Sequence, residues 1–326
     1  MRLEIMRLKL RSEIIKTDSD NSIKFIEADV SDALESIEDK SIDLVLTSPP
    51  YNLRKIYERD RKMSLDQYIS WLEPIIKKIC NKITDNGSIC WQVGNYINNG
   101  EVFPLDYYFY KIFNDEGLKL RNRIIWQFNF GLHAVKRLSG RYETLLWLTK
   151  SDDYIFNLDA IRVPQLYPGK RYSVSKGAKK AGKPSGNPLG KNPTDYWEFS
   201  AEEYFKEDAI WKIPNVKANH PEKTIHPCQF PHELAERCIL AFTKKNDKVL
   251  DPFVGAGTTA VAAAKSGRSA VVIDKDSDYI ALSKQRLKQL LDGTLQLRLS
   301  GKKIVKPNTK DRVARVPIEW NNGEKL

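Results

Sequence analysis

Apolar residues follow two spacings along the chain, and segments with the two spacings alternate. The run Ile42–Thr47 is mostly apolar over the length of a strand, whereas residues 65–83 carry apolar side chains every three to four positions. The first pattern predicts a buried strand and the second an amphipathic helix. The alternation returns between residues 231 and 291. Strands that alternate with helices are typical of α/β proteins, so we expect a doubly wound, mostly parallel sheet.

The other expected elements are short. Strands are expected at 23–27, 88–93, 118–129, 143–148, 248–250 and 270–273, and helices at 32–37, 105–114, 231–242, 258–266 and 279–291. A turn at Asn86-Gly87 is expected to lead into the strand 88–93, because Asn-Gly pairs favour tight turns. The segments 118–129 and 143–148 are expected to pair with each other.

Regular patterning stops between residues 157 and 224. This stretch is rich in Pro, Gly, Lys and Trp, which is typical of a loop-rich insertion. We therefore predict one main domain formed by residues 1–156 and 225–292, an inserted module at 157–224, and a basic C-terminal tail at 293–326.

The chain carries a formal net charge of +11, which favours polyanionic partners such as nucleic acids. The excess is concentrated in residues 169–191, which hold seven Lys/Arg, five Gly and no acidic residue, and in the tail. A solvated loop has the same composition, and that alternative stays open. If the segment binds DNA, the candidate contacts are Lys170, Arg171, Lys176, Lys179, Lys180 and Lys183.

The sequence disfavours several classes of protein and site. No apolar run approaches the roughly 18 residues of a membrane span, and the N-terminal residues lack the apolar core of a signal peptide. The four cysteines, Cys80, Cys90, Cys228 and Cys238, form no C-x-x-C motif and do not combine with histidines at zinc-site spacing. We expect a cytoplasmic protein with reduced core cysteines and no metal site.

A strand, a tight turn and a helix are predicted at residues 249–260. Gly255 and Gly257 let the backbone bend sharply and a ligand approach, and the next strand ends in Asp274, whose carboxylate suits a ribose diol. An NAD-dependent oxidoreductase has the same pattern. The Asp251 carboxylate is expected to face a cationic group, which favours S-adenosylmethionine over a pyrophosphate. The cofactor-binding candidates on this turn are Asp251, Pro252, Phe253, Gly255, Gly257 and Thr258.

The sequence Thr47-Ser48-Pro49-Pro50-Tyr51 ends the predicted strand Ile42–Thr47, at the sheet edge where open α/β folds bind ligands. Prolines have no N–H, so nearby carbonyls stay available as acceptors. The Ser48 hydroxyl and the Pro49 carbonyl would accept the N–H groups of an exocyclic base amine and direct its lone pair towards a sulfonium methyl. Tyr51 offers a face on which an extruded base can stack. A rigid turn with a packed tyrosine is the structural alternative.

These motifs resemble those of the amino-group DNA methyltransferases of bacterial restriction–modification systems, over about residues 23–157 and 220–290. The resemblance implies that Ser48, Pro49, Pro50 and Tyr51 are catalytic and that the turn 251–257 binds S-adenosylmethionine. Because the catalytic motif precedes the cofactor motif, the order resembles the β arrangement of the family.

The resemblance also implies roles for residues outside these two turns. Asp29 would lie beside the adenine of the cofactor, Asp274 would bind its ribose, and His226-Pro227 would lead the helix beside its methionine. A helix cap for Asp29 and a loop position for His226 are open alternatives. The implied partners are double-stranded DNA and a cognate restriction endonuclease, and a homodimer is compatible with the sequence. Residues 157–224 are expected to read the target sequence.

The target base is predicted less directly. Within the family, a leading serine such as Ser48 resembles the cytosine-N4 group, and His226-Pro227 with Phe230-Pro231 favours the same base. Asn52 is common in adenine-N6 enzymes, so adenine N6 is the alternative. Pro227-Cys228-Gln229 imitates the nucleophile motif of enzymes that methylate cytosine carbon 5, but in the wrong place, so Cys228 is expected to be structural.

More distant alternatives differ in class. An NAD-dependent oxidoreductase would explain the glycine turn but not Ser48–Tyr51, and a non-enzymatic DNA-binding protein would explain the charge but not the glycine turn. RNA or a protein amide nitrogen is a nearer alternative as substrate, since the same turn suits any planar amine.

Overall fold

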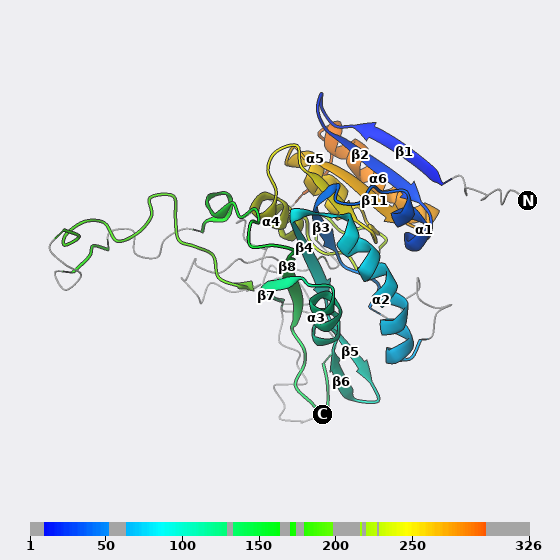
Figure 1. The fold of residues 1–326 in the computed structure, drawn as a ribbon, viewed down its shortest axis with the longest axis horizontal. Helices are drawn as coiled ribbons and strands as arrows, with labels where there is room; N and C mark the ends of the chain where they lie inside the picture. The colour runs from blue at the N-terminus through cyan, green and yellow to red at the C-terminus, as the bar shows by residue number, and fades with distance from the viewer. Residues whose placement is uncertain are drawn as a thin grey trace, which may run out of the picture.

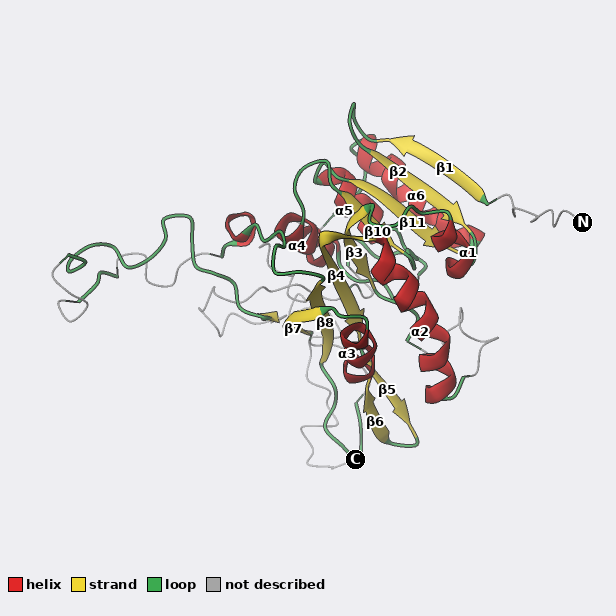
Figure 2. Ribbon diagram, viewed as in Figure 1, coloured by secondary structure: helices red, strands yellow, loops and turns green. Residues whose placement is uncertain are grey.

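The computed structural model describes residues 10–51, 63–128, 133–163, 170–173, 179–197, 216, 220–226 and 228–297. In this part of the chain, helices cover both faces of a nine-stranded sheet, and a two-stranded hairpin lies beside it (Figures 1 and 2). The strands are β1 (Arg11–Lys16), β2 (Ser22–Glu27), β3 (Ile42–Thr47), β4 (Ile83–Val93), β5 (Asn95–Asn98), β6 (Glu101–Pro104), β7 (Lys119–Gln127), β8 (Tyr142–Thr149), β9 (Tyr196–Trp197), β10 (Lys248–Asp251) and β11 (Ser269–Asp274). The helices are α1 (Val30–Glu35), α2 (Leu65–Lys82), α3 (Leu105–Asp115), the 3-10 helix η2 (Leu158–Ile161), α4 (His232–Phe242), α5 (Thr258–Lys265) and α6 (Ser277–Leu291).

The sheet has the strand order β1-β2-β11-β10-β3-β4-β8-β7-β9. Its centre, from β2 to β4 in this order, is parallel, whereas β1 and β8 run antiparallel to their neighbours. The chain passes from β3 to β4 in one direction along the sheet and from β10 to β11 in the other. Ligands of open α/β sheets bind at such a switch point, outside the carboxyl ends of the strands. The ends of β3 and β10 therefore mark the expected site.

Two hydrophobic clusters fill the two faces of the sheet. Helices α1, α2 and α3 contribute to one cluster and α4, α5 and α6 to the other. In β3, Leu44 and Leu46 face the second cluster and Val45 faces the first. A strand buried on both faces needs apolar side chains at successive positions, which explains the apolar run in the sequence.

Most predicted elements are confirmed, including β3 and the antiparallel pair β7–β8. The turn expected at Asn86-Gly87 is wrong, because β4 already begins at Ile83. Ile42 pairs with Ile83 but Leu44 pairs with Ser88, so the Asn-Gly pair lies in a bulge inside β4. The pattern also missed β1 and the hairpin β5–β6. Since β1 is an edge strand that is mostly exposed, it carries little apolar signal.

Regular structure is sparse in the described residues between η2 and α4. Val163 and Lys191 form an isolated bridge, with N–O distances of 3.0 and 2.7 Å, and the chain between them is called the arm (residues 163–191). In Figure 1 the arm is the green segment that projects away from the helices and the sheet. Beyond it, β9 forms the edge of the sheet and pairs in parallel with β7. The division of the chain into a main domain, a module and a tail remains a prediction.

Candidate functional site

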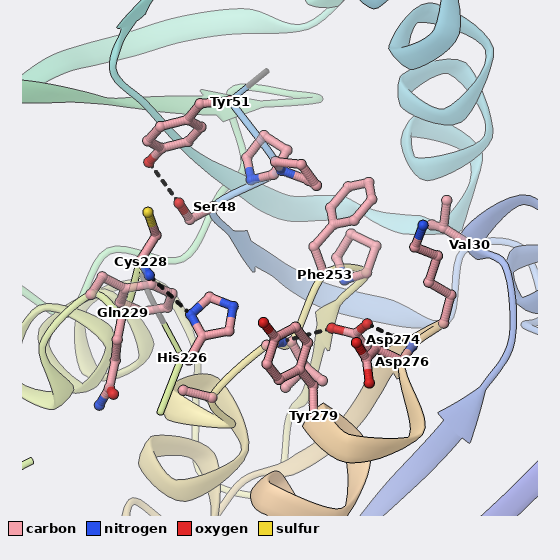
Figure 3. A pocket seen from close by; sticks show the side chains of 18 of the residues that line it. Val30, Ser48, Tyr51, His226, Cys228, Gln229, Phe253, Asp274, Asp276 and Tyr279 are labelled. Carbon is pink, nitrogen blue, oxygen red and sulfur yellow. Dashed lines mark hydrogen bonds between the residues drawn. The ribbon is translucent and has the colours of Figure 1, made fainter. Parts of the chain in front are cut away.

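A pocket lies at the carboxyl ends of β2, β3, β10 and β11, and its empty space is about 1180 Å³ with its open mouth included. Figure 3 shows Tyr51 and Ser48 at one end of it, Asp274, Asp276 and Val30 at the other, and His226 between them. The predicted site residues that line it are Asp29, Ser48, Pro49, Pro50, Tyr51, His226, Pro252, Phe253, Gly255, Thr258 and Asp274. Pro227 lies outside the described residues.

Asp251, which the sequence predicts to face a cofactor cation, does not line the pocket in this structure. The side chain is completely buried, and its carboxylate accepts hydrogen bonds from Thr47 Oγ1 at 2.7 Å, Thr259 Oγ1 at 2.6 Å and the Phe253 N–H at 3.1 Å. Burial raises the pKa of Asp251 to about 6. The residue ties β3 to β10 and anchors the glycine turn from below.

The two glycines of the turn have different neighbours. Both have positive φ, 47° for Gly255 and 79° for Gly257, which favours glycine at each position. A Cβ on Gly255 would lie 2.8 Å from His226 Nε2, whereas a Cβ on Gly257 would lie 2.8 Å from the Ser283 Cα. Gly257 is therefore needed for packing against α6, and it is not among the residues that line the pocket.

Asp274 and Asp29 present carboxylates to the pocket from the ends of two strands. Asp274 accepts hydrogen bonds from the Gly255 and Asp276 N–H groups, each at 3.0 Å, and burial raises the pKa of its carboxyl. Asp29 Oδ1 accepts from the Ser31 N–H at 2.9 Å and caps α1. Asp29 thus caps α1, as one prediction had it, and also lines the pocket, as the role beside a cofactor requires.

His226 is a neutral side chain in the wall of the pocket. Its Nδ1 accepts a hydrogen bond from the Cys228 N–H at 3.3 Å, so the neutral ring carries its proton on Nε2, next to Gly255. The ring packs edge-on against Tyr279, with 4.6 Å between the ring centroids. Burial lowers the pKa of His226 to about 4. The residue is therefore uncharged at neutral pH.

A chain of hydroxyl groups links the turn after β3 to a carboxylate on another strand. Ser48 Oγ and Tyr51 OH lie 2.6 Å apart, and Tyr51 OH donates to Glu143 Oε2 at 3.3 Å. The hydroxyl of Tyr68, on α2, donates to the Pro50 carbonyl at 2.5 Å. These contacts fix the Pro-Pro turn against both β8 and α2.

Several lining residues were not predicted from the sequence. Val30, Met63 and Trp71 join the predicted Phe253 in the apolar part of the wall, and Tyr279 adds a ring from α6. Cys228 also lines the pocket, so the expectation that all four cysteines belong to the core is wrong for this one. Apart from Phe253 and Cys228, these residues lie in no motif, and only the folding of their elements around the pocket brings them together.

The predicted DNA contacts lie apart from the pocket. Lys170, Arg171, Lys179, Lys180 and Lys183 are exposed on the arm, and Lys176 lies outside the described residues. A second basic segment, which the sequence reasoning missed, is the connection between β7 and β8. It carries Lys136, Arg137 and Arg141, and two apolar side chains beside them, Val135 and Leu138, are 97% and 93% exposed.

The described residues contain neither a metal-binding cluster nor a membrane-spanning helix. No group of three or more His, Cys, Asp and Glu side chains there is arranged to hold a metal ion. In the same residues, none of the helices has both the length and the apolar character of a membrane span.

Curated proteins with similar sequences are DNA methyltransferases. The type II methyltransferase M.BglII of Bacillus subtilis is 44% identical over 265 residues, which cover 81% of this chain and 68% of that protein. The DNA adenine methyltransferase YhdJ of Escherichia coli K12 is 31% identical over 267 residues, which cover 80% of this chain and 81% of YhdJ.

Solved structures show the same fold. PvuII DNA methyltransferase, described as cytosine-N4-specific, aligns with a TM-score of 0.58 at 18% identity, covering 87% of this chain and 96% of that one. A DNA modification methylase of Thermus thermophilus, solved with S-adenosyl-L-methionine, aligns with a TM-score of 0.53 at 25% identity, covering 84% and 97%.

The sequence model of a DNA methylase family, N6_N4_Mtase, matches residues 42–285, a span that contains both the Ser48–Tyr51 turn and the glycine turn. The chain therefore belongs to this family, and it is a DNA amino-methyltransferase that uses S-adenosyl-L-methionine.

Proposed function

We propose that this protein methylates the exocyclic N4 of cytosine at a specific sequence in double-stranded DNA, acting on a base flipped out of the duplex. The observation that carries the proposal is the shared pocket, in which Ser48 lies across from Asp274 and the Gly255 turn. One wall thus offers an acceptor for a base amine and the other a site for the methyl donor.

The residues of the pocket suit S-adenosylmethionine, which supplies an electrophilic methyl group on a sulfonium. The carboxylate of Asp274 would accept the ribose hydroxyls, and Asp29 with the apolar wall of Val30, Trp71 and Phe253 would hold the adenine. His226 and the turn at Gly255 would contact the methionine end.

The charge of the lining also favours a cationic ligand. Asp29, Asp274 and Asp276 outnumber the one cation, Lys275, among the described lining residues. A cationic ligand is attracted by this balance, whereas a dinucleotide pyrophosphate is repelled by it. These three carboxylates, and not Asp251, which is buried outside the pocket, therefore support S-adenosylmethionine over a dinucleotide.

The turn after β3 would activate the base amine by position. Ser48 Oγ and the Pro49 carbonyl would accept the two N–H groups and leave the nitrogen lone pair directed at the methyl group. The ring of Tyr51, which also lines the pocket, would stack on the base. Stacking is worth about 1–3 kcal/mol and would offset part of the cost of flipping.

Two exposed basic segments would hold the duplex. The arm supplies Lys170, Arg171 and the three lysines 179, 180 and 183, and we propose that residues 157–224 read the target sequence. The β7–β8 connection ends beside the pocket, because Glu143 near the start of β8 contacts Tyr51. Its cations would bind phosphates next to the flipped base, with Val135 and Leu138 facing the opened base stack.

We also propose a biological setting and keep one alternative base. Like the type II methyltransferase M.BglII, the protein would protect host DNA from a restriction endonuclease with the same target. Ser48 at the head of the motif supports cytosine N4. Adenine N6 is the alternative, supported by Asn52 and by the 31% identity to the adenine methyltransferase YhdJ.

The test is a product analysis. Purified protein is incubated with S-adenosylmethionine and unmethylated plasmid DNA, and the DNA is then digested to nucleosides for mass spectrometry. We expect N4-methylcytosine, and none in a control without S-adenosylmethionine. N6-methyladenine as the only product would refute the choice of base, and no methylated nucleoside would refute the function as a whole. Sequencing of the methylated positions identifies the target site.

A further inference from the structure

Glu143 is a carboxylate beside the pocket that belongs to neither of the two turns. It lies near the start of β8, one position from the pair formed by Thr144 and Val93. Gln92 on β4 holds it there, with Nε2 donating to Glu143 Oε2 at 2.6 Å. The Tyr51 hydroxyl donates to the same oxygen at 3.3 Å. A strand pair of the sheet therefore fixes the far end of the hydroxyl chain.

The carboxylate gives the chain a direction. Tyr51 OH has one proton, and a carboxylate only accepts, so the proton points towards Glu143. In the 2.6 Å contact between Ser48 Oγ and Tyr51 OH, Ser48 must then be the donor. Ser48 is left with lone pairs facing the pocket. If the direction were reversed, the Ser48 proton would face the N–H groups of a base amine, and two donors would meet.

We propose that Glu143 is a positioning residue for methyl transfer, which sets the direction of the chain Ser48–Tyr51–Glu143 and receives the proton that the reaction releases. This inference rests on the proposed role of Ser48 as the acceptor for the base amine. Transfer forms an N–C bond, breaks the S–C bond of the methyl donor and removes one proton from the nitrogen. That proton passes to Ser48 Oγ, while the Ser48 proton moves to Tyr51 and the Tyr51 proton moves to Glu143. Both hydroxyls are restored and the carboxylate ends protonated.

The first test measures rate and binding separately. Glu143→Gln keeps the shape of the side chain but removes the charge that accepts the proton. We expect the single-turnover rate of methyl incorporation into duplex DNA to fall by about 10²-fold. The dissociation constants for the duplex and for S-adenosylmethionine should stay within about twofold of the original. Glu101→Gln, at the start of the hairpin strand β6, is the matched control and should leave rate and binding unchanged.

A double-mutant cycle tests the path through the tyrosine. Tyr51→Phe keeps the stacking ring but removes the hydroxyl in the middle of the chain. If Glu143 acts through that hydroxyl, the double variant Tyr51→Phe with Glu143→Gln should be no slower than the slower single variant. Rate losses that multiply would overturn the proposal, because Glu143 would then act by another route.

Other outcomes separate this inference from the proposed function. If the original protein methylates DNA and Glu143→Gln is equally fast, the role of Glu143 is refuted and the function stands. If Glu143→Gln loses rate and duplex affinity by the same factor, the residue shapes the binding surface and the proton path is refuted. If the original protein incorporates no methyl group into DNA, the proposed function itself fails.

Discussion

The two turns that leave the centre of the sheet lie side by side and use their polar side chains in opposite ways. After β3, Ser48 and Tyr51 line the pocket and connect through their hydroxyls to Glu143. After β10, Asp251 lies beneath the backbone and accepts hydrogen bonds from two threonines and a main-chain N–H. Polar residues at the ends of two neighbouring parallel strands thus line the pocket in one turn and lie buried beneath the backbone in the other.

The largest expected effect, on the rate of methyl transfer, comes from replacing Ser48, which lines the pocket. Ser48→Ala should lower the single-turnover rate of methyl transfer by about 10²–10³-fold, because the variant no longer holds the reacting amine with a preorganised acceptor. The melting temperature and the affinity for S-adenosylmethionine should be nearly unchanged, since Ser48 lies in the pocket wall rather than the core. An equal loss of cofactor affinity would mean that the turn after β3 serves mainly to build the cofactor site.

Asp251, the buried residue of this comparison, should affect the free energy of unfolding. Burial raises the pKa of Asp251 in the folded protein to about 6, above its ordinary value of 3.8, so the ionised form costs stability at high pH. That cost shrinks as the pH falls from about 6 towards 3.8, because the carboxyl then protonates in the folded protein while it is still ionised in the unfolded chain. Relative to Asp251→Asn, the original protein should gain about 2 kcal/mol in unfolding free energy between pH 8 and pH 4. Urea unfolding across this pH range measures it, and parallel curves for the two proteins would contradict the assignment.

An effect of similar size is expected at Asp274, whose carboxylate both accepts two main-chain hydrogen bonds and lines the pocket. Asp274→Asn should weaken S-adenosylmethionine binding roughly 30-fold. This factor corresponds to about 2 kcal/mol, which is typical of a hydrogen bond to a charged group. Calorimetry measures the change, and Asp278→Asn, on the exposed side of α6, is the control. Unchanged cofactor affinity would place Asp274 with Asp251 as a structural carboxylate.

The smallest effect belongs to the arm, which lies outside the comparison of the two turns. Replacing Lys179, Lys180 and Lys183 with alanine should raise the dissociation constant for duplex DNA by about tenfold at physiological salt. The salt dependence should also flatten, by about 0.9 in log–log slope for each phosphate that the variant no longer neutralises. The methylation rate at saturating DNA should be retained. Alanine at Lys77 and Lys111, on α2 and α3, is the control, and an unchanged slope in the arm variant would show that the arm does not bind DNA.

The sequence predicted the helices and strands that bury a large part of their own side chains. In β3 and the helices from α2 to α6, the spacing of apolar residues depends only on which face of the element is buried. Their bounds were therefore predicted within a few residues. β1 and the hairpin β5–β6 have largely exposed residues and left no such pattern. The bulge around Asn86 and Gly87 depends on pairing with β3, which local sequence does not specify.

The residues of the candidate site could be predicted from the sequence where they belong to a short motif in one turn. Ser48, Tyr51, Gly255 and Asp274 occur in short motifs, and the structure places all four around the pocket. Asp251 has the same residue type and the same place at the end of a strand as Asp274, and only its burial by Thr47 and Thr259 distinguishes the two. Glu143 was missed because its contact with Tyr51 joins residues 92 positions apart in the chain.

The bridge between Val163 and Lys191 has a consequence for how such an enzyme changes over time. Because Val163 and Lys191, the two ends of the arm, pair at this bridge, the chain leaves the body and returns to it at one point. A segment joined in this way can be lengthened, shortened or exchanged between relatives as a cassette, while the methyl-transfer machinery stays intact. If the arm reads the target sequence, as proposed above, recombination at its base would change the sequence preference, and the same junction would suit the grafting of recognition loops in the laboratory.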